Sequence, residues 1–308
     1  MAAILHSNME TDLRLAAMIG REIRSLLTDM ASLRNTGAVE FLGDVSGTGS
    51  DTMRVRLAGL DGYDSFAATA AENTDVSNTS LTDASVDVAV VRAALRYDLG
   101  DLARLTGYGS DIDPFRLAAS MVGSFEQYFN AILADQFASV TNSVGSTGVD
   151  LTVANWFSAV GTLEANSVPG PFYAVLFPQQ LADLQSSLRS ESGPAEHISA
   201  SQELINAKGP GFAGNFLGVD IYTSSDVDAV NAGADSSGCM WGAGAFGYAT
   251  GSPAPAMGGT DEMRPAGSPI VVEITRDASS AITEIVGNAY CGVALLEDSR
   301  AVEIITDR

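Results

Sequence analysis

Apolar residues recur along the chain at helical spacing in some segments and at strand spacing in others. The clearest helical pattern covers 114–139, where one apolar stripe comprises Leu117, Met121, Phe125, Tyr128, Phe129, Ile132 and Leu133. Asp113 suits the N-cap and Pro114 the first helical position. The spacing therefore predicts a long helix whose aromatic stripe is core and not a cofactor site.

The segments before this helix predict an extended β-arm. An amphipathic helix is expected over 9–34 and a Gly/Ser-rich connector over 37–50, whereas 51–57 and 86–99 have the composition of strands. Between the strands, 58–85 consists mostly of small and polar residues. Such a segment cannot bury enough apolar surface to build its own core, so it needs a surface supplied by another chain.

The middle and C-terminal segments predict an α/β module followed by a β-rich tail. In the middle, a Gly/Ser-rich turn is expected at 142–148, helices at 151–165, 178–190 and 198–208, and a strand at 171–177. A glycine turn at 209–218 then leads into a strand, and a glycine-interrupted strand follows at 238–251. The tail is expected to contain a Pro/Gly/Met-rich loop at 254–268 and strands at 269–277, 281–298 and 301–307. Alternating helices and strands over about a hundred residues are typical of one compact domain.

Charge and cysteine content narrow the classes of function. With 16 Lys+Arg and 38 Asp+Glu, the formal net charge is −22, which argues against general binding to nucleic acid backbones or anionic membranes. Lys208 is the only lysine, so amine chemistry is almost absent. Cys239 and Cys291 lie in no zinc or disulfide pattern, which favours a reduced intracellular origin. Neither a signal peptide nor a membrane span of ~20 apolar residues is evident, so we expect a soluble protein that is not exported through a signal peptide.

Two motifs that suggest ligands have simpler explanations. The glycines of 209–214 do not match a phosphate loop, because Lys208 precedes them and a strand follows. An acidic stretch resembles a calcium loop, but its fifth position is Val230; its members are Asp226, Asp228, Asn231 and Asp235. We predict a tight turn for the first motif and a solvated acidic loop for the second.

Catalytic constellations are not evident in the sequence. His6 and His197 are the only histidines, and neither GxSxG nor HExxH occurs. Asp111 and Asp113 form a possible carboxylate pair, but capping already explains Asp113. We therefore predict no catalytic, cofactor-binding or metal-binding residues, no cofactor and no enzyme activity, and we expect the protein to act through its surfaces.

The order of these pieces resembles the major capsid proteins of tailed bacteriophages, which have the Hong Kong 97-type fold. Three local matches support the resemblance across nearly the whole chain. In the first, Leu217 and Gly218 form a turn into a short strand, with Val219 and Ile221 in the strand and Ser224 near its end. AENTDVSNTS at 71–80 resembles the polar tip of the family's E-loop, and VLFPQQLADL at 175–184 is a strand that runs into a helix.

The resemblance implies an α+β fold with four parts. These are an N-terminal arm at 1–50, an extended β-hairpin E-loop at 51–99, a P-domain with a long spine helix at 100–145 and 252–308, and an α/β A-domain at 146–251. The glycine-rich stretch before the strand at 219 then serves to turn the chain within the A-domain.

The resemblance also implies a function in assembly. Subunits would form pentamers and hexamers of an icosahedral shell around double-stranded DNA, located in the virion and, during assembly, in the host cytoplasm. Implied partners are further copies, a separate scaffolding protein, a portal and a decoration protein, with no sequence-specific DNA binding and no membrane. A lysine-based crosslink from the E-loop is not expected, because Lys208 lies outside it. The alternatives are an encapsulin-like nanocompartment and, from another class, an acidic β-rich binding module that would remain monomeric.

Overall fold

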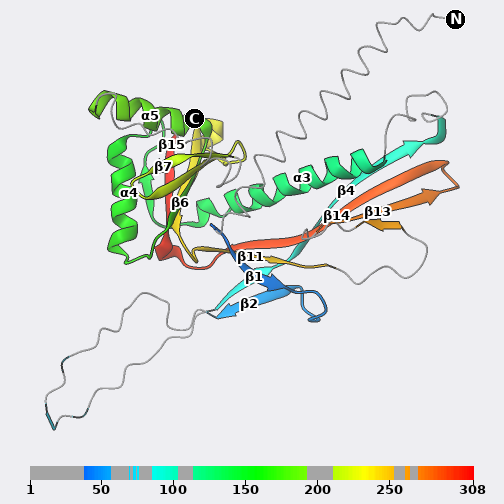
Figure 1. The fold of residues 1–308 in the computed structure, drawn as a ribbon, viewed down its shortest axis with the longest axis horizontal. Coiled ribbons are helices and arrows are strands. Elements are labelled where there is room, and N and C mark those ends of the chain that lie inside the picture. Colours follow the sequence, from blue (N-terminus) through cyan, green and yellow to red (C-terminus); the bar gives the residue numbers. More distant parts are fainter. Residues whose placement is uncertain are drawn as a thin grey trace, which may run out of the picture.

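The computed structural model describes residues 38–56, 69, 72–73, 75, 85–102, 114–192, 211–252, 261–263 and 270–308. Figure 1 shows a rounded head at one end of the molecule and a long, flat arm that extends away from it. The helices predicted at 9–34 and 198–208, the Asp113 cap and nearly all of 58–84 lie outside the described residues.

The head is a seven-stranded mixed sheet with two helices, α4 (Val153–Ala165) and α5 (Pro178–Ser192). Its strands run in the order β5-β15-β10-β6-β8-β7, with β9 paired to β10. They are β5 (Ser143–Gly145), β6 (Phe172–Leu176), β7 (Phe212–Phe216), β8 (Val219–Thr223), β9 (Ala229–Val230), β10 (Asp235–Gly242) and β15 (Ala301–Asp307). The strand at 171–177 and the helices at 151–165 and 178–190 are therefore confirmed.

The arm is a six-stranded sheet covered on one face by the long helix α3 (Pro114–Ala134), as Figure 1 shows. Its order is β1-β11-β14-β13-β12, and β4 also pairs with β14. The strands are β1 (Glu40–Asp44), β4 (Val91–Gly100), β11 (Phe246–Thr250), β12 (Asp261–Met263), β13 (Ile270–Asp277) and β14 (Ile282–Leu295). A separate two-stranded hairpin, β2 (Thr52–Arg56) with β3 (Ser85–Ala89), lies beside it.

Three short 3-10 helices complete the described structure: η1 (Phe137–Ser139), η2 (Asn231–Gly233) and η3 (Asp298–Arg300). The helix predicted at 114–139 is too long, because α3 ends at Ala134 and η1 follows it. The following backbone bonds have 3-10 spacing, with Ser139 N donating to the Gln136 carbonyl. This tighter turn directs Phe137 into the core, 5.6 Å from the ring of Trp241.

Several segments predicted as connectors contain strands. The expected connector at 37–50 includes β1, the turn at 142–148 includes β5, and the loop at 254–268 includes β12. The glycine turn at 209–218 contains β7, which forms a hairpin with β8. The predicted strand at 238–251 is two strands in two sheets, divided at Gly244, where φ is +81°.

The predicted turn at Leu217 and Gly218 is confirmed, with φ values of +56° and +77°. These left-handed conformations let the chain reverse tightly between β7 and β8. The stretch thus turns the chain between two strands of the head sheet.

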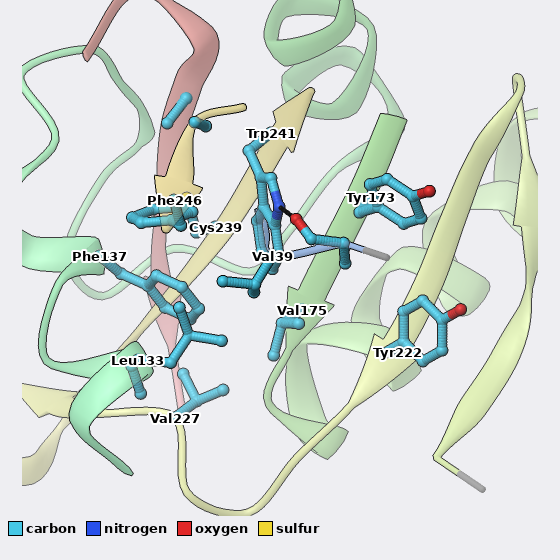
Figure 2. Packing of buried hydrophobic residues seen from close by; sticks show 14 of the residues in the cluster. Val39, Leu133, Phe137, Tyr173, Val175, Tyr222, Val227, Cys239, Trp241 and Phe246 are labelled. Carbon is cyan, nitrogen blue, oxygen red and sulfur yellow. Dashed lines mark hydrogen bonds between the residues drawn. The ribbon is translucent and has the colours of Figure 1, made fainter. Parts of the chain in front are cut away.

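One core joins the head to the arm (Figure 2). It brings together β6, β8 and β10 of the head, the end of α3, β11 of the arm, and the segment that leads into β1. In its middle Trp241, fully buried, donates its indole N–H to the Ala38 carbonyl over 2.7 Å. A second core lies on the other face of the head sheet, under α4 and α5, around Trp156, Leu163 and Leu184.

The two sheets do not follow the sequence-based division of the chain. β5 and β15 lie in the head sheet, although the ranges that contain them, 100–145 and 252–308, are assigned to the P-domain. β11 lies in the arm sheet, although 146–251 is assigned to the A-domain. The domain boundaries themselves stay a prediction.

Candidate functional site

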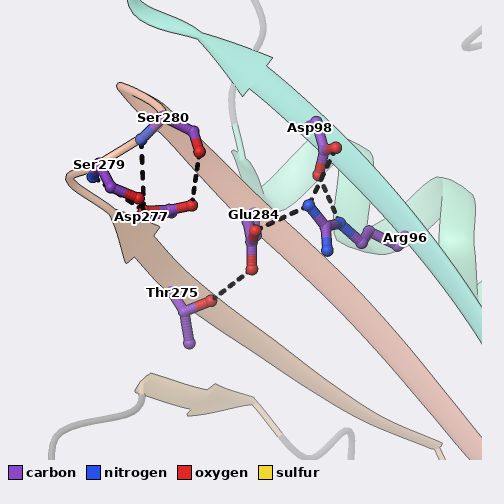
Figure 3. Close-up of polar contacts among 7 residues, drawn as sticks. All are labelled: Arg96, Asp98, Thr275, Asp277, Ser279, Ser280 and Glu284. Atoms are coloured by element: carbon purple, nitrogen blue, oxygen red, sulfur yellow. Dashed lines mark hydrogen bonds and ion pairs between the residues drawn. The ribbon is translucent and has the colours of Figure 1, made fainter.

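The face of the arm sheet opposite α3 carries a ladder of polar side chains (Figure 3). Arg96 on β4 contacts Asp98 at 2.6 Å and Glu284 on β14 at 2.7 Å, and Thr275 on β13 donates to Glu284. The hydrogen bond to Asp98 raises the pKa of Arg96. Further along, Arg92 donates two bonds, of 2.9 and 2.7 Å, to the side-chain oxygen of Asn288.

The turn between β13 and β14 ends this ladder. The Asp277 carboxylate accepts hydrogen bonds from the hydroxyls of Ser279 at 2.6 Å and Ser280 at 2.8 Å, and from the Ser279 amide. These donors lower the pKa of Asp277 to about 2. The far end of the arm is therefore a well-formed polar turn.

The β2–β3 hairpin is anchored to the arm by a small apolar cluster. Val88 on β3 packs with Ala249 and Leu296, and all three are buried. β3 passes so close to β14 that a Cβ at Gly292 would lie 2.0 Å from the Ala89 carbonyl oxygen. Arg54 and Asp87 form an ion pair across the hairpin. The hairpin, whose two strands flank the polar segment 57–84 in the sequence, is thus packed closely against the arm.

The acidic loop of the head differs from its prediction. Asp235 is fully buried, and its carboxylate accepts from the Gly148 amide at 2.7 Å and the Asn231 side chain at 2.8 Å. Partial burial and the neighbouring Asp135 raise the pKa of Asp228. The prediction of a solvated loop is therefore wrong for Asp235, which ties the segment before β10 to the segment after β5. Among the described residues, no group of three or more His, Cys, Asp or Glu side chains is arranged to hold a metal ion.

The two cysteines lie in different sheets and are both buried. Burial raises the pKa of Cys239 well above its ordinary value, and the nearby Glu303 adds to the shift. Glu303 is itself buried, accepts from the Ser237 hydroxyl at 2.5 Å, and has a pKa raised by burial. A buried thiol with a raised pKa is unreactive at neutral pH.

Other candidate residues lie outside the described part of the chain. They are His6, His197, Lys208, Asp111 and Asp113. Within the described part, no helix is both long enough and apolar enough to cross a membrane.

The sequence does not indicate which apolar side chains are exposed. Large exposed ones on the described surface are Phe41, Val91, Leu102, Val149, Phe157 and Leu217. Phe157 lies on α4 and Leu217 at the adjacent β7–β8 turn, and both lie beside Phe216, whose ring is 6.4 Å from that of Phe157. Leu217 was recognised as a turn residue, but its exposure has no signal in the sequence.

No protein-family model matches the sequence, and no curated protein matches it. Solved structures do match over most of their length. The capsid of cyanophage P-SCSP1u aligns with a TM-score of 0.60 at 13% identity, covering 87% of this chain and 86% of that one. A structure of Mycobacterium phage Che8 aligns with a TM-score of 0.59 at 17% identity, covering 90% of both chains.

An encapsulin chain matches equally well. The SrpI encapsulin of Synechococcus elongatus PCC 7942, in its holo complex, aligns with a TM-score of 0.60 at 14% identity, covering 91% of this chain and 87% of that one. At these identities the likeness establishes a shared fold and no more. That fold includes both the head and the arm, because the alignments cover nearly the whole of each chain.

Proposed function

We propose, because the chain has the fold of tailed-phage major capsid proteins, that it is the major capsid protein of a tailed bacteriophage. It assembles as pentamers and hexamers into an icosahedral shell that encloses double-stranded DNA. The main support for this proposal is the likeness to phage capsid chains over about nine-tenths of both chains. A protein that had only an α/β head in common with these capsid chains would align over the head and not over the arm.

The arm supports the proposal through its composition. Between β2 and β3, residues 57–84 contain no Lys or Arg and five acidic residues: Asp61, Asp64, Glu72, Asp75 and Asp83. This segment has too few large apolar residues to form a core, whereas its base is held by buried Val88. A segment with a fixed base and no core of its own is suited to lie on a neighbouring subunit.

The charge of the chain suits a container for DNA. A net charge of −22 repels the phosphate backbone, so a shell of such subunits encloses DNA without sequence-specific or tight binding. The shell forms in the host cytoplasm and resides in the virion. A separate scaffolding protein, a portal and a decoration protein are its expected partners.

The direct test is assembly of the purified protein. We expect closed shells containing pentamers and hexamers, seen by sedimentation and cryo-electron microscopy, with a scaffold partner supplied and salt varied. A chain that stays monomeric at high concentration under all these conditions contradicts the proposal and favours an acidic binding module.

A second candidate is an encapsulin-like compartment, which the match to SrpI favours. The two candidates differ in their contents. Particles purified from the native source should contain DNA that resists added nuclease if the protein is a capsid, and a co-purifying cargo enzyme if it is an encapsulin.

Deletion of residues 66–80 tests the role of the segment between β2 and β3. The subunit should stay folded, because its described cores lie elsewhere, and shell yield should fall. The control is Phe125→Asp, which places a charge in the buried contact between α3 and the arm sheet and should prevent folding itself. Circular dichroism and particle yield separate the two outcomes, and a deletion variant that assembles like wild type contradicts the role.

A further inference from the structure

Two neighbouring segments carry the chain between the head sheet and the arm sheet. Residues 243–245 lead from β10 of the head to β11 of the arm, and residues 296–300 lead from β14 back to β15 (Figure 1). Pairing of β10 with β15 ends at Trp241 and Ala301, and pairing of β11 with β14 begins at Phe246 and Leu295. The two segments therefore form a joint that belongs to neither sheet.

Backbone hydrogen bonds join the two segments at the arm end of this joint. The amides of Leu296 and Glu297 both donate to the Ala245 carbonyl, over 2.7 and 3.3 Å. Among the described residues, no other backbone hydrogen bond links residues 243–245 to residues 296–300. The strand ladder is thus interrupted on the head side of the joint.

The side chain of Arg300 supplies a link where the ladder is interrupted. Its Nη1 donates to the Ala243 carbonyl over 3.0 Å, and its Nε pairs with one carboxylate oxygen of Glu297. The other oxygen of Glu297 accepts from the Ser299 hydroxyl at 2.9 Å. The side chains of Arg300 and Glu297 are only 19% and 11% exposed, so water competes little for these charged hydrogen bonds.

Gly244 makes room for this contact. A Cβ at this position would lie 3.1 Å from Nη1 of Arg300 and 3.7 Å from a carboxylate oxygen of Glu40 on β1. The residue also has φ of +81°, a conformation that glycine adopts without strain. Because glycine leaves the backbone freer than other residues do, the joint needs a directional contact to keep one geometry.

The apolar core beside the joint is a weaker constraint on direction. It includes Trp241 and Phe246, whose rings pack edge to face at 5.3 Å (Figure 2). Apolar burial is not directional, whereas a hydrogen bond weakens steeply when its distance or angle changes. We infer that Arg300, oriented by Glu297, fixes the angle between the head and the arm.

This role has a consequence for a shell, which rests on the proposed function. Subunits with one fixed angle between head and arm meet their neighbours at one curvature and form shells of one size. Loss of the Arg300 link should therefore broaden the distribution of shell diameters seen by cryo-electron microscopy.

The main test measures the joint in the dissociated subunit. Spin labels at Ser158→Cys on α4 and Ala278→Cys in the turn after β13 report the distance between head and arm, and both label sites are exposed. The two native cysteines are buried, which protects them from labelling. Arg300→Met keeps the length of the side chain and removes its donors, so the distance distribution should widen about twofold.

Two further variants make the result specific. Arg276→Met also removes a guanidinium–carboxylate pair, with Asp101 at 2.5 Å, but this pair lies at the far end of the arm, so the distribution should not change. Glu297→Gln keeps the shape of the side chain and an acceptor oxygen, and it should cause a smaller widening than Arg300→Met. This milder variant still provides the test if Arg300→Met does not fold.

The outcomes distinguish this inference from the proposed function. Distributions as narrow in Arg300→Met and Glu297→Gln as in wild type would overturn the inference, whatever the protein assembles into. Equal widening in Arg276→Met would overturn it as well. Widening in both joint variants, with a wild type that never forms shells, would support the joint and contradict the proposed function. Widening with unchanged shell diameters would support the role in the subunit and overturn its consequence for the shell.

Discussion

The sheets of the head and the arm differ in what covers their faces. In the head, one face packs under α4 and α5, and the other packs against the end of α3 and the segment before β1. In the arm, α3 covers one face between β4 and β13, while the opposite face there carries the ladder of Arg96 and Glu284. The head is therefore a layered core, whereas the arm is a two-layer slab with a solvated side.

Burial along the strands follows from this difference. Every residue of β10 is buried, as are four of the five residues in β6. β4 instead alternates between more and less exposed residues over most of its length, with Leu95 and Tyr97 turned toward α3 and Arg96 turned away. A strand covered on both faces is apolar on both sides, whereas a strand covered on one face alternates between apolar and polar residues. The arm thus has less core per residue and presents more surface for contacts.

The strongest test of this comparison is a matched pair of phenylalanine truncations. Phe137→Ala removes a ring enclosed by Trp241 and Phe246, and Phe125→Ala removes one between α3 and the arm sheet. Each should cost about 3–5 kcal/mol in the free energy of unfolding. The cost for Phe137→Ala should lie at the upper end of this range. The cavity left by Phe125→Ala can close in part, because α3 covers only one face of the arm sheet and can move toward it.

Urea titration of the dissociated subunits, with amide exchange to locate the affected region, measures both values. An equal or larger cost at Phe125 would show that the arm core is as rigid as the shared core of head and arm.

A second pair tests how closely α3 approaches the arm sheet. A Cβ at Gly287 would lie 2.6 Å from the Phe125 ring, so Gly287→Ala should force the ring to move and cost about 1–3 kcal/mol. The control Gly100→Ala is in the same sheet and meets no atom within 4 Å, so it should change stability little. If thermal unfolding responds equally to both, the helix does not press on the sheet at Gly287.

The sequence predicts the elements whose pattern is complete within one segment. The apolar strand at 171–177 and the helix that follows Pro178 could be recognised because their spacing and flanking residues agree. β1 and β5 could not, since each is short and pairs with a strand far along the chain, β11 or β15. β7 was missed because FAGNF reads as a glycine turn, although its hydrogen bonds to β8 make it a strand.

The surface of the head shows the same limit. The turn at Leu217 and Gly218 was predictable from local sequence. The exposure of Phe157 was not, because most of its neighbours on the same face of the helix are small residues, which are compatible with either burial or solvent. Asp235 was assigned to a solvated loop, since its partner Gly148 is 87 positions away.

The head and the arm should also differ in their response to pH. Burial raises the pKa of Glu303 above its ordinary value of 4.5, so the folded head binds this proton more tightly than the unfolded chain does. The fold is then favoured below about pH 4.5 and penalised as the pH rises through the raised pKa. Glu303→Gln should remove this penalty while still accepting the Ser237 hydrogen bond.

The stability of Glu303→Gln relative to wild type should therefore grow from pH 4 to pH 7. Urea midpoints across this range measure it. The control Glu164→Gln removes the same charge from the exposed surface and should give a flat difference. A flat difference for Glu303→Gln as well would mean that the carboxylate is ionised in the head at little cost.

The arm turn should show the opposite sign and the smallest effect. Hydrogen bonds from Ser279 and Ser280 lower the pKa of Asp277 from 3.8 to about 2, so the turn gains stability that is complete above pH 4 and is lost as the pH falls toward 2. The turn is at the surface, so global unfolding is a poor readout, and amide exchange at Ser279, whose N–H donates to Asp277 at 2.9 Å, reports on it directly. In wild type the protection of this amide, corrected for intrinsic exchange, should fall between pH 4 and pH 2. In Asp277→Asn, which keeps an acceptor oxygen but no charge, protection should be lower at pH 5 and should not change with pH over that interval. A wild-type profile without this fall would show that the serine donors do not hold the carboxylate in solution.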